Sequence, residues 1–150
     1  MTRGGTESEV ADGLEFVDSN ILLYAYDRSA GARHERAAQL VGALGADRRG
    51  AISIQVLQEF YVNVTRKIAE PLGHDVALDR LRALRRWPLH VPQGDDVIDA
   101  AELAHRSQVS FWDAMIIRSA AALECSVLWS EDLSHGQCID GVTVRNPFLP

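Results

Sequence analysis

The feature that most constrains the fold of this chain is a short apolar segment ending on an acidic residue, because the pattern occurs twice. Residues 14–17 are followed by Asp18, and residues 126–129 are followed by Ser130, Glu131 and Asp132. Each segment has the length and composition of a buried strand. In an open parallel sheet, ligands sit beyond the carboxyl ends of the strands. We therefore expect Asp18 and Asp132 to converge at one edge of such a sheet.

A helix is expected directly after the first of these strands. Ser19 or Asn20 is a suitable N-terminal cap for an apolar helix over residues 21–26. Taken alone, Asp18 is an ordinary capping or turn residue, since aspartate favours helix starts. Only together with three later acids, Glu59, Asp113 and Asp132, does Asp18 indicate a chemically functional site.

The rest of the chain alternates helix-like and strand-like segments without a repeat or a linker, which predicts one α/β domain over residues 14–150. Apolar spacing predicts helices over 32–44 (closed by Gly45), 55–68, 75–86, 95–107 and 110–125. Further strands are expected over 51–54, 87–91 and 142–144, with 87–91 at a sheet edge because it contains Pro88. In the helix over 95–107, the residues expected to point inward are Val97, Ile98, Ala101, Leu103 and Ala104.

Two of the acids lie on predicted helices, and each allows two interpretations. Glu59 is on the polar side of the helix over 55–68, so periodicity alone places it in solvent, and a groove-lining position is the alternative. Ser110 and Asp113 have the spacing of a capping box. The helix dipole also favours a carboxylate at Asp113, and that carboxylate remains free to bind a cation.

Charge limits the kinds of partner that the chain can bind. The formal net charge of −6 argues against a sequence-independent nucleic-acid coat, whose affinity comes from neutralising phosphates. A negative net charge is still compatible with an enzyme that binds phosphates through bound cations. Arg82, Arg85 and Arg86 share one face of a predicted helix. That face is either a solvated surface or a patch that steers phosphates towards the protein.

Residues 1–13 are polar and are expected to be loosely ordered. They lack the apolar core of a signal peptide, and no stretch approaches the ~20 apolar residues needed to span a membrane. We therefore expect a cytoplasmic protein. The two cysteines, Cys125 and Cys138, lack metal-ligand spacing and are expected to be reduced, buried thiols.

Five motifs, taken in order, are similar to those of a known family. They are Val17-Asp18-Ser19-Asn20-Ile21-Leu22-Leu23-Tyr24, Gln58-Glu59-Phe60, Phe111-Trp112-Asp113-Ala114-Met115-Ile116, Trp129-Ser130-Glu131-Asp132-Leu133 and Val144-Arg145-Asn146-Pro147-Phe148. The chain resembles a PIN domain over nearly its whole length, and more narrowly the toxin of a VapBC-type toxin–antitoxin pair. Each motif alone is weak, but four acids in the family's order and spacing are a strong signal. The resemblance implies a three-layer α/β/α sandwich around a mostly parallel sheet.

The resemblance also implies roles for individual residues. The family's acidic metal-binding and catalytic positions are matched by Asp18, Glu59, Asp113 and Asp132, and its auxiliary polar positions by Asn20 and Ser130. Asp18 and Asp113 are expected to be direct metal ligands. Glu59 and Asp132 are expected to bind metal directly, to bind it through water, or to orient the attacking water. RNA as substrate, a cognate antitoxin as partner and a homodimer are likewise implied.

These residue types suit the implied chemistry. Phosphodiester cleavage needs an activated water and neutralised phosphate charge, and Mg²⁺ or Mn²⁺ held by carboxylates supplies both. The predicted function is therefore a divalent-metal-dependent endoribonuclease, the toxin of a toxin–antitoxin pair. One alternative is a PIN-like module that binds RNA or protein without turnover. Another is a receiver domain, which would carry a lysine after its last strand where this chain has Arg145, a poor substitute for a compact point charge.

Overall fold

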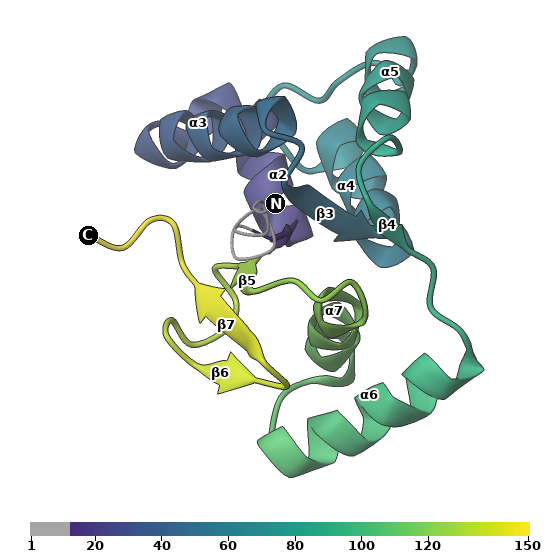
Figure 1. Cartoon of the computed structure of the whole chain (residues 1–150). Helices are drawn as coiled ribbons and strands as arrows, with labels where there is room; N and C mark the ends of the chain where they lie inside the picture. Colours follow the sequence, from purple (N-terminus) through teal and green to yellow (C-terminus); the bar gives the residue numbers. More distant parts are fainter. Residues whose placement is uncertain (1–12) are drawn as a thin grey trace, which may run out of the picture.

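The computed structural model describes residues 13–150, so the prediction about residues 1–13 falls outside it except at Gly13. Its sheet has the strand order β4-β3-β2-β5-β7-β6 (Figure 1). The strands are β2 (Glu15–Val17), β3 (Gly50–Ser53), β4 (Leu89–His90), β5 (Val127–Trp129), β6 (Cys138–Ile139) and β7 (Val142–Arg145). All neighbours pair in parallel except β6 and β7. As predicted, β4 lies at an edge, where its preceding proline costs no ladder hydrogen bond.

The helices form a layer on each side of the sheet. They are α2 (Ser19–Tyr26), α3 (Ala32–Ala46), α4 (Ile54–Arg66), α5 (His74–Leu84), α6 (Gly94–Ser107) and α7 (Phe111–Ala122), with a short 3₁₀ turn, η1 (Arg28–Ala30), after α2. The chain moves outward from β2 to β3 and β4, then returns to β5 on the other side of β2. Because crossovers are right-handed, this reversal puts α6 and α7 on the face opposite to α2, α3, α4 and α5. The predicted three-layer sandwich is confirmed (Figure 1).

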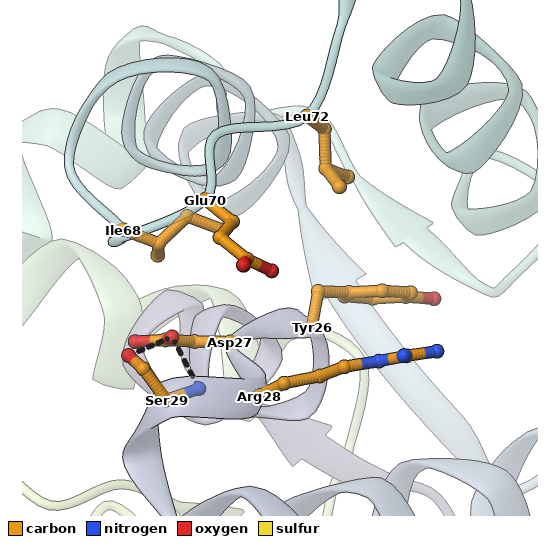
Figure 2. Close-up of a pocket in the computed structure, with 7 residues that line it drawn as sticks. All are labelled: Tyr26, Asp27, Arg28, Ser29, Ile68, Glu70 and Leu72. Atoms are coloured by element: carbon orange, nitrogen blue, oxygen red, sulfur yellow. Dashed lines mark hydrogen bonds between the residues drawn. The ribbon is translucent and has the colours of Figure 1, made fainter.

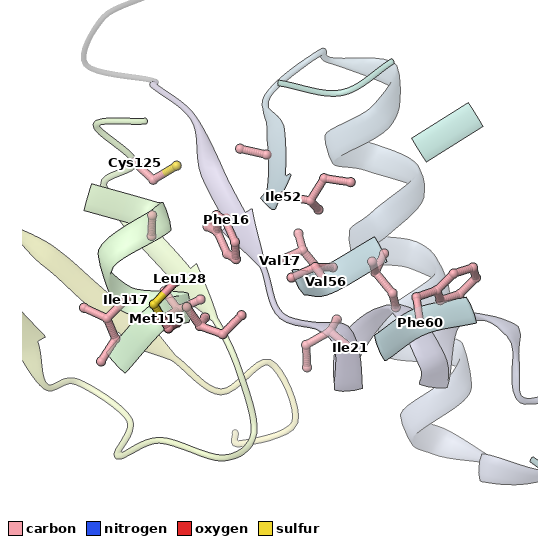
Figure 3. Close-up of a cluster of buried hydrophobic side chains, with 14 of the residues drawn as sticks. Phe16, Val17, Ile21, Ile52, Val56, Phe60, Met115, Ile117, Cys125 and Leu128 are labelled. Carbon is pink, nitrogen blue, oxygen red and sulfur yellow. The ribbon is translucent and has the colours of Figure 1, made fainter. Parts of the chain in front are cut away.

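The core lies on both faces of the central strand β2. Phe16 and Val17 are fully buried, and so are Ile52 of β3 and Leu128 of β5 on either side (Figure 3). A strand that is covered on both faces has no polar side to show, which explains the continuous apolar runs in the sequence. Phe60 of α4 completes the packing on one side of the sheet. This core surrounds the paired strands β2 and β5, whose carboxyl ends lie side by side.

Several element boundaries differ from the predicted ones, and at two of them a hydrogen bond shows the cause. Helix α3 continues past Gly45 to Ala46, because the N–H of Asp47 still bonds the carbonyl of Ala43. Strand β3 ends at Ser53, whose Oγ accepts a hydrogen bond from the N–H of Val56 at 3.3 Å. That hydroxyl caps α4, so Ile54 belongs to the helix and not to the strand.

Strand β6 was not predicted, although the sequence holds a signal for it. Asp140 and Gly141 form a two-residue turn to β7, and both have positive φ angles, 51° and 82°. Asp-Gly is a favoured pair for such a hairpin turn. Cys138 lies on this edge strand and is exposed, so only Cys125 is the buried thiol expected.

The predicted inward face of α6 is wrong in its N-terminal half. Val97 and Ile98 are 44% and 59% exposed, and Ala101 is exposed, whereas Ala100 and Leu103 are buried. The inward stripe of α6 begins instead at the half-buried Asp96, which pairs with Arg118 of α7 at 3.4 Å. Periodicity missed this stripe because its first member is charged.

Two further findings concern the surface. The three arginines Arg82, Arg85 and Arg86 are exposed, and α5 ends before the last two of them. A role for them in contacting RNA stays a prediction. In the part of the chain that the structure describes, no helix is both long and apolar enough to cross a membrane.

Candidate active site

The strand order places the candidate site. Connections leave β2 and β5 towards opposite edges of the sheet, so these neighbours form its topological switch point. Ligands of open α/β sheets bind beyond the carboxyl ends of the strands at such a point. Asp18 lies there, and its N–H donates to the carbonyl of Trp129 at 3.0 Å. The first acid of the sequence therefore stands beside the end of β5.

Asp18 is itself the N-terminal cap of α2, and not Ser19 or Asn20 as predicted. Its backbone is extended, and its Oδ1 accepts a hydrogen bond from the N–H of Ser19 at 2.7 Å. Its Oδ2 accepts one from Oγ of Ser130 at 2.8 Å. The residue is only 4% exposed. Burial raises the pKa of Asp18 from its ordinary value of 3.8 to about 7, against the effect of these two hydrogen bonds, and the charges of Asp132 and Glu59 raise it further.

Ser130 connects the first acid to the last. Its fully buried Oγ donates to Asp18 and accepts a hydrogen bond from the N–H of Asp132 at 3.1 Å. Asp132 itself is exposed, on the loop after β5. The neighbouring Glu131 ties this loop to the helical layer, because it accepts hydrogen bonds from the hydroxyl of Tyr24 at 2.8 Å and from Nε of Arg33 at 2.7 Å.

Glu59 belongs to the same neighbourhood, which corrects the interpretation that placed it in solvent. It is half-buried, and its Oε1 accepts a hydrogen bond from Oγ of Ser19 at 2.7 Å. Its Oε2 accepts one from Nε2 of Gln55 at 3.2 Å. The same amide group lies 3.3 Å from the carbonyl oxygen of Trp112, at the start of α7. The flank of α4 therefore faces the starts of two other helices, which its own periodicity does not reveal.

Asp113 lies in the first turn of α7. Ser110 caps this helix as predicted, because its Oγ accepts a hydrogen bond from the N–H of Asp113 at 3.0 Å. Burial raises the pKa of Asp113, and so do the charges of Asp132 and Glu59, while a hydrogen bond with Ser110 lowers it. Asp132 and Glu59 thus lie close enough to both Asp18 and Asp113 for their charges to raise the pKa of each.

The chemistry of this cluster suits a hard divalent cation. Within residues 13–150, none of the four carboxylates has a salt-bridge partner. Both polar atoms of the Asn20 side chain, in the first turn of α2, are buried without a hydrogen-bond partner among the described residues. In the same range, no three His, Cys, Asp or Glu residues are grouped closely enough to enclose a metal. Mg²⁺ is usually held through only one or two carboxylates and keeps several waters, so it does not require such a group.

Ser19 and Gln55 were not predicted as site residues. Both hold the carboxylate of Glu59. The sequence predicts only a helix-capping role for Ser19. Gln55 is one turn before Glu59 on the same helix, so its spacing was a usable signal.

A pocket of about 250 Å³ lies at the other end of α2 and contains none of the four acids (Figure 2). It is lined by Tyr26, Asp27, Arg28, Ser29, Ile68, Glu70 and Leu72. Asp27 accepts hydrogen bonds there from the N–H and Oγ of Ser29. Asp27 thereby caps the 3₁₀ turn η1. This pocket is therefore separate from the acidic site.

The sequence model of the PIN domain family matches residues 16–136, which include all four acids. The chain belongs to the PIN domain family. No curated protein matches its sequence.

Solved structures agree with the PIN fold. A toxin–antitoxin complex from Klebsiella pneumoniae contains a chain with a TM-score of 0.65 and 21% identity, and the match covers 89% of this chain and 98% of that one. VapC20 of Mycobacterium tuberculosis, a toxin that cleaves the sarcin–ricin loop, has a TM-score of 0.59 and 22% identity, covering 78% of this chain and 88% of its own. At these identities the likeness is one of fold.

Proposed function

We propose that this PIN domain is a divalent-metal-dependent endoribonuclease. The observation that carries the proposal is Asp18, a buried carboxylate at the switch point with three further acids nearby and no salt-bridge partner in the described part of the chain. Like charges gathered in this way cost stability when no cation neutralises them. Strongly perturbed carboxyl groups of this kind concentrate at functional sites.

The side chains divide the work as follows. Asp18 and Asp113 would hold Mg²⁺ or Mn²⁺ directly, and Glu59 and Asp132 would bind it directly or through water, or orient the attacking water. The bound ion would lower the pKa of a water and neutralise phosphate charge. Ser130 fixes one oxygen of Asp18, since its hydroxyl donates to Oδ2 and leaves the second lone pair of that oxygen free.

The biological role that we propose is that of the toxin in a toxin–antitoxin pair. It is supported by family membership and by the folds of the two solved neighbours, one from a toxin–antitoxin complex and one an RNA-cleaving toxin. On this proposal the substrate is cytoplasmic RNA, the partner is a cognate antitoxin, and the active form is a homodimer.

The enzymatic proposal is tested with purified protein and end-labelled RNA. Cleavage should require Mg²⁺ or Mn²⁺ and should stop in chelator. Asp18→Asn and Asp113→Asn should each lower the rate at least 100-fold, because asparagine keeps the shape but loses the charge that holds the cation. Asp95→Asn, an exposed acid on α6, is the matched control and should cleave normally. Cleavage at the wild-type rate in chelator would contradict the metal mechanism.

Expression in cells tests the toxin role and the alternative of a binding module without turnover. Wild-type protein should arrest growth, and co-expression of the antitoxin should relieve the arrest. The Asp18→Asn variant should be harmless. If the wild type is harmless and the purified protein binds RNA without cleaving it in the presence of metal, the binding module is the better account.

A further inference from the structure

Trp112 is the one large aromatic side chain left in solvent within residues 13–150. It is 63% exposed, whereas the other two tryptophans, Trp87 and Trp129, are half-buried. A tryptophan gains more than most residues from burial, so its exposure is informative. It directly precedes Asp113 in the first turn of α7. An exposed aromatic ring is thus next in the chain to a candidate metal ligand.

One ring contact and one backbone hydrogen bond hold Trp112. Its neighbour Phe111 packs against the core, and the two rings meet edge to face, with centroids 5.0 Å apart and an interplanar angle of 74°. The Trp112 carbonyl oxygen accepts a hydrogen bond from Nε2 of Gln55 at 3.3 Å, and the same amide donates to Glu59 at 3.2 Å. The backbone that carries the indole is therefore tied to the acidic site from α4.

We propose that Trp112 is a stacking platform for a base of single-stranded RNA, beside the phosphate that the acids act on. This inference rests on the proposed function. Aromatic side chains stack on any base, because every base has a π-face, and such stacking needs a base that is not enclosed in a duplex. A chain with a net charge of −6 gains little from general attraction to phosphates. Stacking supplies affinity without positive charge.

Tryptophan is also common at the centre of protein interfaces. RNA is favoured here because of the position of the ring. The backbone carbonyl of Trp112 is hydrogen-bonded to Gln55, which also holds Glu59, so the residue that carries the indole lies beside the acids where RNA would bind. If the ring binds a protein partner instead, RNA binding should not depend on Trp112.

The test measures RNA binding in the Asp18→Asn background, so that cleavage does not interfere. The probe is a fluorescently labelled single-stranded RNA oligonucleotide of mixed sequence, and the same RNA annealed to its complement is the second probe. Trp112→Ala should weaken binding of the single strand by about 5- to 140-fold, as expected for the loss of one stacked base at ~1–3 kcal/mol. Trp112→Phe should recover most of the affinity. Binding of the duplex should change by less than twofold.

Ile98→Ala is the matched control, since Ile98 is 59% exposed on α6 and its loss should leave binding unchanged. Tryptophan emission gives a second readout: it should be quenched when RNA binds, and Trp112→Phe should remove that quenching. In the otherwise wild-type enzyme, Trp112→Ala should raise KM for single-stranded RNA more than it lowers kcat.

The outcomes separate this inference from the function on which it rests. Metal-dependent cleavage by wild type, with equal binding and KM in Trp112→Ala, would overturn the stacking role and leave the nuclease standing. Loss of antitoxin binding in Trp112→Ala, with RNA binding intact, would identify a protein contact and also overturn it. Failure of the wild type to bind or cleave RNA would remove both proposals.

Discussion

Removing the buried charge of Asp18 should change the stability of the metal-free protein in opposite directions at low and at high pH. Burial and the neighbouring acids raise the pKa of this carboxyl from 3.8 to about 7 in the folded protein. The folded state therefore holds a proton that the unfolded chain releases between pH ~4 and ~7. Stability must fall as pH rises through that range, because the native state binds more protons than the unfolded state.

The magnitude follows from the same two values. A pKa raised from 3.8 to about 7 corresponds to ~4 kcal/mol at 1.36 kcal/mol for each pKa unit, as an upper estimate. Asparagine carries no such charge. It disturbs the capping hydrogen bond from the N–H of Ser19 and the hydrogen bond from Ser130, at a cost of ~1 kcal/mol. At pH 8 we expect Asp18→Asn to be more stable than wild type by ~3 kcal/mol, or roughly 6–12 °C in Tm. Near pH 3.5 it should be less stable by ~1 kcal/mol.

Thermal unfolding in chelator, followed by circular dichroism from pH 3.5 to 8, measures this difference. Asp27→Asn is the control, because Asp27 is also a cap but lies at the far end of α2. Its difference from wild type should not change sign with pH. A difference between wild type and Asp18→Asn that stays constant from pH 4 to 8 would refute the reasoning.

Three other outcomes are expected. Added Mg²⁺ or Mn²⁺ should raise the Tm of wild type by binding the native state, and should raise that of Asp18→Asn less; equal shifts measured by calorimetry would argue against a metal site at these acids. Gly50→Ala should destabilise by ~1–3 kcal/mol in urea unfolding, because a Cβ there would lie 2.6 and 2.8 Å from ring atoms of Trp87. A Cβ at Gly42 on α3 would have no atom within 4 Å, so Gly42→Ala should instead stabilise the protein by up to ~1 kcal/mol. A Gly42→Ala variant less stable than Gly50→Ala would contradict this account of packing. Tyr24→Phe removes the hydroxyl that holds the loop after β5 and should cost ~1 kcal/mol in the same assay, and an unchanged midpoint would show that the loop is held without it.

Local patterns in the sequence determined most of the fold. Buried strands are recognised in a sequence as short apolar runs. The strands predicted over residues 14–17 and 126–129 are present in the structure as β2 and β5. Ser110 was identified as a cap from its own spacing to Asp113, since capping involves residues three apart in the chain. The acids after β2 and β5 could be expected to meet because parallel strands bring their carboxyl ends to one edge.

Tertiary structure alone decided how the site is assembled. Glu59 lies on the polar flank of α4, and only the placement of α2 beside that flank brings Ser19 within hydrogen-bond reach of its carboxylate. The inward stripe of α6 begins at Asp96, because Arg118 of α7 supplies a partner for a half-buried carboxylate. Periodicity reports which face of a helix is apolar. It holds no information on which polar side chains a neighbouring element will meet, because those contacts join residues far apart in the chain.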